Sequence, residues 1–139
     1  MHEVVIVDAV RSPIGKRGGG LSNSHSIDLL GAVQSSLFAR TGMDPKEVGQ
    51  VVGGCVGQVG MQTMNVTRTA WLTAGLPIEV AATTVDAQCG SSQQATNLAY
   101  ALVASGTVDS AVGCGVELMS QVGFGATIPK EPNAGTPVN

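Results

Sequence analysis

Residues 84–95 read Thr-Val-Asp-Ala-Gln-Cys-Gly-Ser-Ser-Gln-Gln-Ala, a β-branched stretch that passes through a short polar turn into a helix-forming stretch. The pattern predicts a strand over 82–85 and a helix from about Ser91 to Gly106. Cys89 lies at the junction, beside N–H groups that no helical carbonyl accepts. These groups and the helix dipole favour the thiolate, which is the nucleophilic form of cysteine.

The same alternation of strand and helix extends to both sides of this stretch. Three further buried strands are predicted from apolar, β-branched runs, at residues 4–7, 51–56 and 109–113. Helices are predicted from Ser26, as the cap, to Gly42 and from Asn65 to Gly75, with a short helical turn over 44–47. The element order predicts an α/β fold, a mostly parallel open sheet covered by helices on both faces.

Ligands of such sheets bind at the carboxyl ends of the strands. We expect residues 8–9, 86–89 and 117–119 to lie along that edge. The α/β unit is predicted to span residues 1–120. Glycines and prolines interrupt any periodicity beyond that point, so residues 121–139 are expected to be a loop or the start of an insertion.

Composition excludes several classes of protein. The 139 residues carry a formal charge of −3 with only seven Lys and Arg, which leaves no basic surface for nucleic acid. Charged residues make up 12%, against roughly 25% in typical domains. One explanation of this low share is a Gly- and Ala-rich α/β protein whose surface carries few charges. We favour the other, that further subunits or further chain cover much of the exterior.

The cysteines and the first residues bear on the compartment. Three cysteines, without disulfide or zinc spacing, favour a reducing environment and no metal. The first residues lack the features of a signal peptide, and no apolar run is long enough to cross a membrane. We therefore expect a cytoplasmic protein without membrane insertion.

Cys89 is the candidate nucleophile, although a lone thiol is more often a buried structural residue. Gly90, Ser91 and Ser92 favour the catalytic interpretation because small residues let a substrate approach the sulfur. A nucleophilic cysteine needs a base within hydrogen-bond reach. His2 and His25 are the only histidines, and both are expected at the surface on the edge opposite Cys89, so the catalytic set is incomplete.

The remaining candidates have structural alternatives that we favour. Glu117 could be a general base, but a carboxylate that holds neighbouring loop amides is the more usual case. Asn65 and Arg68 are expected to cap or pack a helix rather than to contact a substrate. The methionines could line an acyl cavity, but methionine more often fills gaps in a core; they are Met61, Met64 and Met119.

Four segments, in this order and at suitable distances, carry a resemblance to a known family: residues 9–16 (AVRSPIGK), 65–77 (NVTRTAWLTAGLP), 88–95 (QCGSSQQA) and 113–120 (GCGVELMS). Together they resemble the amino-terminal part of a thiolase, an acetyl-CoA C-acyltransferase. Details in the first two segments look most like thiolases that shorten steroid side chains.

The resemblance implies the first half of a thiolase-like fold and a two-step acyl transfer, in the direction of thiolytic cleavage or of the reverse Claisen condensation. Cys89 would attack the keto group of a 3-ketoacyl-CoA, release acetyl-CoA and keep the shortened chain as a thioester, which a second CoA then takes. The Cys89 N–H would be an oxyanion donor. CoA would be a co-substrate, and no cofactor or metal would be bound. The protein would be a homo-oligomer, either a dimer or a tetramer. Substrate-binding residues are not assigned.

This sequence departs from the family in one large respect. Thiolases have a second half that supplies an Asn, a Gly-His-Pro histidine and a second catalytic cysteine, and none of these is present. A fifth strand is also absent, and Cys55 and Cys114 are expected to be packing residues. We therefore expect a fragment that is inactive alone. The alternatives are a non-catalytic, self-associating fragment and a related ketoacyl-synthase-like condensing enzyme.

Overall fold

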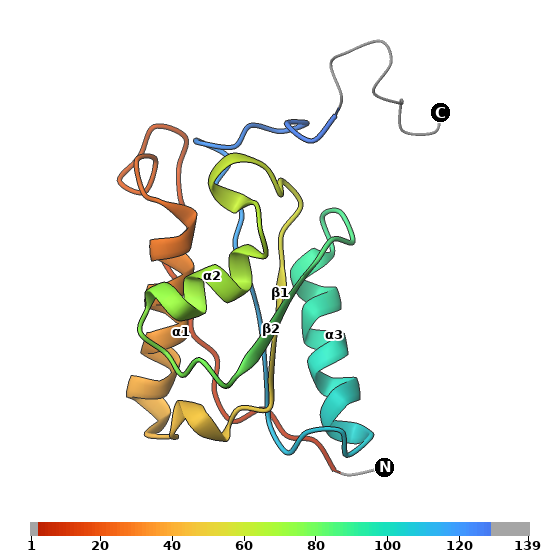
Figure 1. The fold of residues 1–139 in the computed structure, drawn as a ribbon. Coiled ribbons are helices and arrows are strands. Elements are labelled where there is room, and N and C mark those ends of the chain that lie inside the picture. Colours follow the sequence, from red (N-terminus) through yellow and green to blue (C-terminus); the bar gives the residue numbers. More distant parts are fainter. Residues whose placement is uncertain (1–2, 129–139) are drawn as a thin grey trace.

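A computed structural model describes residues 3–128. The described chain forms three parallel strands, three α-helices and two short 3₁₀ helices (Figure 1). In chain order they are α1 (Ser26–Thr41), η1 (Pro45–Glu47), β1 (Gln50–Gly54), η2 (Gly60–Gln62), α2 (Val66–Thr73), β2 (Ala81–Val85), α3 (Ser91–Ala104) and β3 (Ala111–Gly115).

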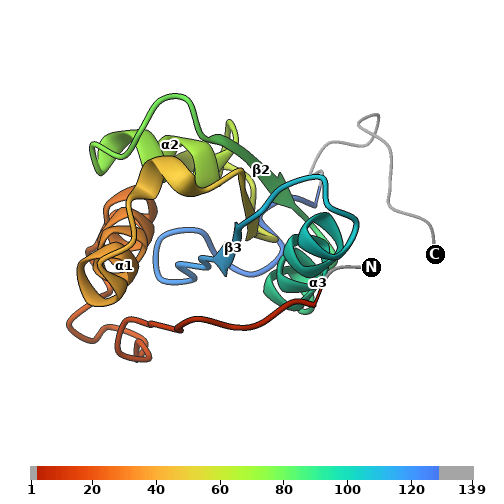
Figure 2. The same ribbon diagram turned by 90° about the horizontal axis from the view of Figure 1, so that it is seen from below.

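The sheet has the strand order β2-β1-β3, and both pairings are parallel. Val51 of β1 lies opposite Ala82 of β2 on one side and Val112 of β3 on the other. Figure 2 shows α1 and α2 on one face of the sheet and α3 on the other. The predicted fold class, an open parallel sheet covered on both faces, is confirmed.

The start of α1 differs from the prediction in one detail. His25 caps the helix, with Nδ1 accepting the Ile27 N–H at 3.3 Å. Ser26, which we expected to be the cap, is fully buried and donates its hydroxyl to the Met61 carbonyl at 2.9 Å. The predicted end is confirmed: Gly42 has a φ of 69°, which glycine adopts without strain, and it donates to the Phe38 carbonyl.

The core lies between the sheet and the α1–α2 layer. Trp71 of α2 is fully buried and meets Phe38 of α1 edge-on, with ring centroids 5.6 Å apart. Its indole N–H donates to the Pro77 carbonyl at 2.8 Å, so this large side chain leaves no polar group unsatisfied. Val51 and Val112 of the sheet belong to the same cluster.

The strand predicted over residues 4–7 is wrong. The segment is extended, but it belongs to no strand, and Val5, Ile6 and Val7 are 70%, 85% and 76% exposed. A cavity of about 1370 Å³ is lined by this segment and by β3, α1 and α3. An apolar run becomes a strand only beside a partner strand. Here the segment runs apart from the free edge of β3 (Figure 2), and residues of both line the cavity.

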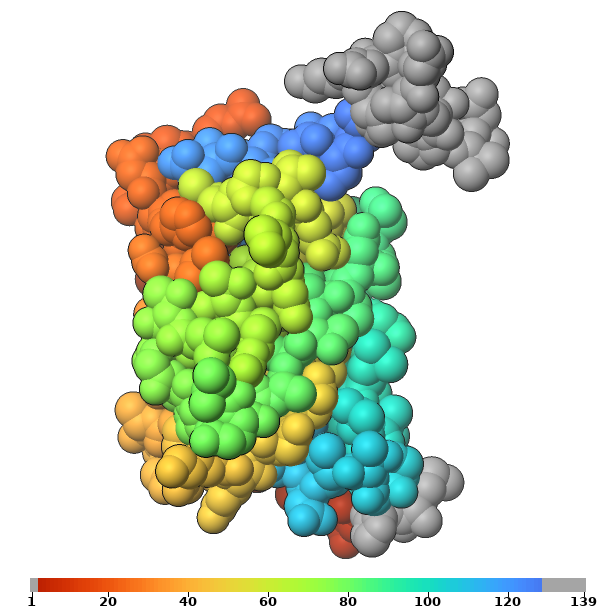
Figure 3. Space-filling view, viewed as in Figure 1, coloured from red at the N-terminus to blue at the C-terminus, as the bar shows by residue number. Residues whose placement is uncertain are grey.

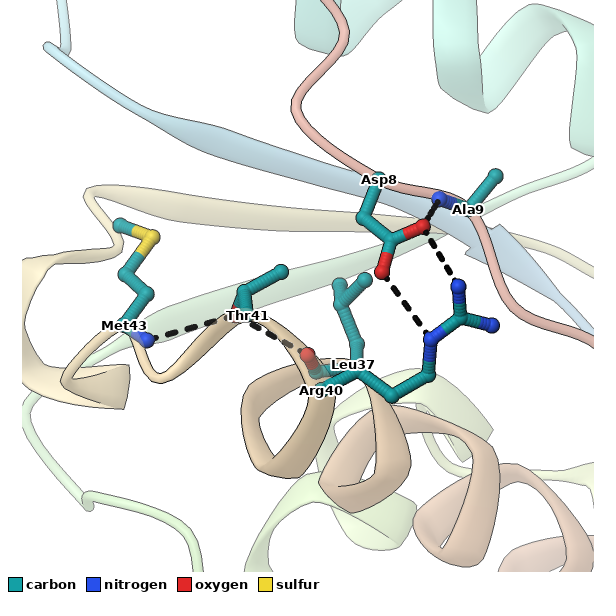
Figure 4. Close-up of polar contacts among 6 residues, drawn as sticks. All are labelled: Asp8, Ala9, Leu37, Arg40, Thr41 and Met43. Carbon is teal, nitrogen blue, oxygen red and sulfur yellow. Dashed lines mark hydrogen bonds and ion pairs between the residues drawn. The ribbon is translucent and has the colours of Figure 1, made fainter.

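Asp8 also departs from its expected place at the carboxyl edge. Its carboxylate binds Arg40, with Nε to Oδ2 at 3.1 Å and Nη2 to Oδ1 at 3.2 Å (Figure 4). Arg40 belongs to the last turn of α1, which lies at the amino ends of the strands (Figure 1). The ion pair therefore holds residues 8–9 toward the opposite edge.

The last strand begins two residues later than predicted, at Ala111. Ser110 instead accepts the Gly49 N–H and donates its hydroxyl to the Glu47 carbonyl, which fastens the turn before β3 to the turn before β1. Residues 121–128 form turns; the rest of the segment predicted as a loop or the start of an insertion, 129–139, lies outside the described residues. Between residues 3 and 128, no helix is long and apolar enough to span a membrane.

Candidate active site

The three strands end at the same edge of the sheet, and the segments that follow them gather there (Figure 1). They are residues 55–62 after β1, the elbow 86–90 between β2 and α3, and residues 116–122 after β3. Two of the three expected groups, 86–89 and 117–119, therefore lie on the predicted edge.

Cys89 is exposed and lies two residues before the start of α3. Two side chains hold the elbow around it. Asp86 accepts the Gln88 N–H at 2.8 Å, and Ser91 both accepts the Ala87 N–H at 3.0 Å and donates to the Gln88 carbonyl at 2.6 Å. The elbow can therefore keep Gln88 at a φ of 53°, which is uncommon for a residue with a side chain.

The first turn of α3 rests directly on the sheet because two strand residues lack side chains. A Cβ at Gly54 of β1 would overlap the backbone between Ser91 and Ser92, and one at Gly115 of β3 would overlap the Ser92 hydroxyl. These glycines therefore set the position of the helix start, and with it the position of Cys89. Sequence reasoning missed Asp86, Ser91 and both glycines as positioning residues; the Asp86–Ser91 spacing around the turn was the available signal.

The other two thiols have different surroundings. Cys55 is 1% exposed, and burial, with smaller effects from the Glu117 and Asp86 charges, raises its pKa to about 12. Burial raises the pKa of Cys114 to about 11, although a hydrogen bond from Gln34 opposes the shift. Both stay protonated at neutral pH, as expected of packing residues. Of the three thiols, Cys89 is the exposed one.

Glu117 makes the contacts of a structural carboxylate. It accepts the Val56 N–H at 2.8 Å and the Gly57 N–H at 3.2 Å, and also binds the side-chain amide of Gln62. We expected a structural Glu117 to bind neighbouring loop amides, and these three contacts are of that kind. Its lone pairs are used by these donors, which argues against a general base.

The placement of His25 requires a correction. In a parallel α/β unit each helix begins at the carboxyl edge, and α1 does so, which places His25 on the same edge as Cys89 and not on the opposite one (Figure 1). However, His25 caps α1, which covers the face of the sheet opposite α3, the helix that follows Cys89. Its Nδ1 is already used as the acceptor of the helix cap. His2 lies outside the described residues.

Asn65 and Arg68 have the predicted structural roles. Asn65 caps α2 by accepting the Arg68 N–H, and its amide donates to the Ala82 carbonyl at 2.9 Å. The Arg68 guanidinium donates to the carbonyls of Ile78 and Val80. The preference for methionines as core filling is wrong for Met64 and Met119, which are 89% and 56% exposed because both lie in turns.

No group of three or more metal-ligating side chains occurs within residues 3–128. The exposed thiol, the elbow and the small residues around it suit a covalent acyl acceptor.

A sequence model described as "Thiolase, N-terminal domain" matches residues 4–134. The chain belongs to the thiolase family. A steroid 3-ketoacyl-CoA thiolase, FadA6, of Mycobacterium tuberculosis is 47% identical to this thiolase chain over 122 residues, which are 88% of this chain and 30% of the relative. A 3-ketoacyl-CoA thiolase of Acinetobacter baumannii is 42% identical over 134 residues, or 96% of this chain and 34% of the relative.

The thiolase fold is confirmed by a solved structure. The crystal structure of the Bacillus anthracis acetyl-CoA acetyltransferase superimposes with a TM-score of 0.79 and 40% identity, over 86% of this chain and 30% of the other. The thiolase chain thus spans about a third of the length of these relatives. The family match favours a thiolase over the ketoacyl-synthase-like alternative.

Proposed function

We propose that this chain is the nucleophile-bearing amino-terminal portion of a 3-ketoacyl-CoA thiolase and that Cys89 is the acyl acceptor. The observation that carries the proposal is the position of Cys89, exposed at a hydrogen-bonded strand-to-helix elbow, while Cys55 is buried and Cys114 is only partly exposed. The names of the two curated relatives support a 3-ketoacyl-CoA as the substrate class. A steroid-bearing acyl part is the finer proposal, supported by the 47% identical relative.

In the proposed first step, the Cys89 sulfur attacks the C3 keto carbon and the C2–C3 bond breaks. The bonding electrons leave with acetyl-CoA, which takes up a proton, and the shortened acyl chain remains on Cys89 as a thioester. In the second step the thiol of CoA attacks this thioester and Cys89 is released. The Cys89 N–H, on the same residue as the nucleophile, is the proposed donor to the carbonyl oxygen.

The proton transfers require groups that residues 3–128 do not bring to Cys89, since His25 caps a helix and Glu117 is occupied by loop amides. The proposal therefore assigns turnover to a complete protein and none to this chain alone. It also includes CoA as co-substrate, no bound cofactor, a homo-oligomer and a cytoplasmic location.

The test is thiolysis of acetoacetyl-CoA by the protein expressed from its complete reading frame. Wild-type protein should cleave the substrate, and Cys89→Ser should reduce the rate to background because the alkoxide needed for attack is not accessible at neutral pH. Cys114→Ala, which removes a partly exposed thiol whose pKa is raised, is the matched control and should retain activity. A C89S protein as active as wild type would overturn the proposal.

A second candidate function is that of a non-catalytic self-associating module. The exposed apolar residues beside the cavity favour it, since contiguous apolar surface usually marks a contact site. It predicts association without acyl transfer. Thiolysis by the isolated 139-residue polypeptide would eliminate this candidate.

A further inference from the structure

Glu117, two residues after β3, binds the loop that follows β1. Its Oε2 accepts the Val56 N–H at 2.8 Å, and its Oε1 accepts the Gly57 N–H at 3.2 Å and the Gln62 Nε2 at 2.9 Å. All three donors are neutral. The ion pair found among residues 3–128 joins Asp8 and Arg40, so Glu117 is held by amides and not by a cation.

Gln62 is a second residue that joins the loop after β1 to the segment after β3. It is 0% exposed, and its amide uses both ends: Oε1 accepts the Leu118 N–H at 2.7 Å, while Nε2 also donates to the Gly57 carbonyl at 2.8 Å. A buried amide with every bond directed in this way has one favourable orientation. The loop after β1 and the segment after β3 therefore form one unit, and Figure 3 shows them side by side at this edge.

Two routes connect this unit to the elbow that carries Cys89. The Cys55 N–H donates to the Val85 carbonyl at 3.1 Å, one residue before the elbow begins. The backbone of Gly54 lies against the backbone of Ser91 and Ser92 at the start of α3. A shift of the loop would therefore be transmitted to both ends of the elbow.

We propose that Glu117 and Gln62 form a positioning clamp, which fixes the loop 56–61 against the Cys89 elbow and thereby aligns the acyl group for transfer. The inference rests on the proposed function, and it assigns both residues a role through the loop rather than in the chemistry. The loop carries three half-buried apolar side chains, those of Val56, Val59 and Met61. Misplacement of a reacting group by about 1 Å costs roughly 100-fold in rate.

The test compares Glu117→Gln, Gln62→Met and the double variant in the protein made from its complete reading frame. Both substitutions roughly keep the side-chain length. Glu117→Gln removes the charge and leaves one carbonyl oxygen as acceptor, whereas Gln62→Met removes every hydrogen bond of the amide. Glu79→Gln, at an exposed carboxylate before β2, is the matched control. The readouts are kcat and KM for acetoacetyl-CoA thiolysis, with kcat normalised to alkylatable Cys89, and amide exchange at Val56, Gly57 and Leu118.

Each single variant should lower kcat by about 10- to 100-fold with KM changed less than about threefold. Because the two residues act as one unit, the double variant should lose no more than the worse single variant. Exchange of the three amides should accelerate, and the pH profile of kcat should keep its position. The control should match wild type in every readout.

Unchanged kcat in either variant, or losses that multiply in the double variant, would overturn the clamp. So would a loss confined to E117Q together with a shifted pH profile, because that result identifies a general base. If wild-type protein transfers no acyl group, the proposed function fails and the clamp with it. An active wild type with unaffected variants overturns the clamp alone.

Discussion

At the scale of single residues, the three cysteines differ by burial. We predict that iodoacetamide at pH 8 alkylates Cys89 at least about tenfold faster than Cys55 or Cys114 in the native chain, because the raised pKa values of Cys55 and Cys114 leave little thiolate and Cys55 is also buried. Peptide mass mapping over time measures the three rates. The unfolded chain in urea is the control, and there the three rates should converge.

The same two buried thiols make stability depend on pH. An unfolded cysteine loses its proton near pH 8.5, whereas native Cys55 and Cys114 keep theirs to about pH 12 and 11. The unfolded state therefore binds fewer protons than the native state between pH 9 and 11, and stability falls as pH rises. Each thiol contributes up to about 1.4 kcal/mol per pH unit.

Urea unfolding at pH 7, 9 and 10 measures this dependence. The control is a Cys55→Ala/Cys114→Ala variant, which retains every lysine and tyrosine and should lose less stability over the same pH range. Equal pH slopes for the two proteins would contradict the assignment.

At the scale of elements, the start of α3 depends on the absence of a side chain in β1. Gly54→Ala would force a methyl group into the backbone at Ser91 and Ser92, so we expect a loss of about 3 kcal/mol in unfolding free energy and slower alkylation of Cys89. Gly20→Ala is the matched control because a Cβ there meets no atom within 4 Å. A G54A protein as stable as G20A would contradict this account of the packing.

The sequence predicted the elements whose signals are local. The Gly42 and Asn65 caps, the Pro45 turn and the elbow at Cys89 each depend on a few neighbouring residues, and the structure has them where they were expected. The strand predicted at residues 4–7 was wrong because a strand forms only beside a partner strand, which is distant in the sequence. The Asp8–Arg40 ion pair and the Glu117–Gln62 contacts join residues 32 and 55 positions apart, which no local pattern specifies.

At the scale of the whole molecule, the low share of charged residues is matched by exposed apolar side chains around the large cavity. Ile6 and Ile14, 85% and 89% exposed, line the large cavity beside β3. We predict that the 139-residue polypeptide alone self-associates, and that Ile6→Lys shifts it toward monomer in sedimentation velocity. Ile78→Lys, at an apolar side chain 70% exposed and remote from the cavity lining, is the control and should leave association unchanged. A monomeric wild-type polypeptide would contradict the prediction.

The most direct test of the account is to find which thiol accepts the acyl group. The protein from the complete reading frame is mixed with acetoacetyl-CoA without free CoA, quenched in acid and mapped by peptide mass. The account predicts one acetyl group per chain on the peptide that contains Cys89, removed when CoA is added. An acyl group on Cys55 or Cys114, or no acyl group on a protein that cleaves the substrate, would contradict it.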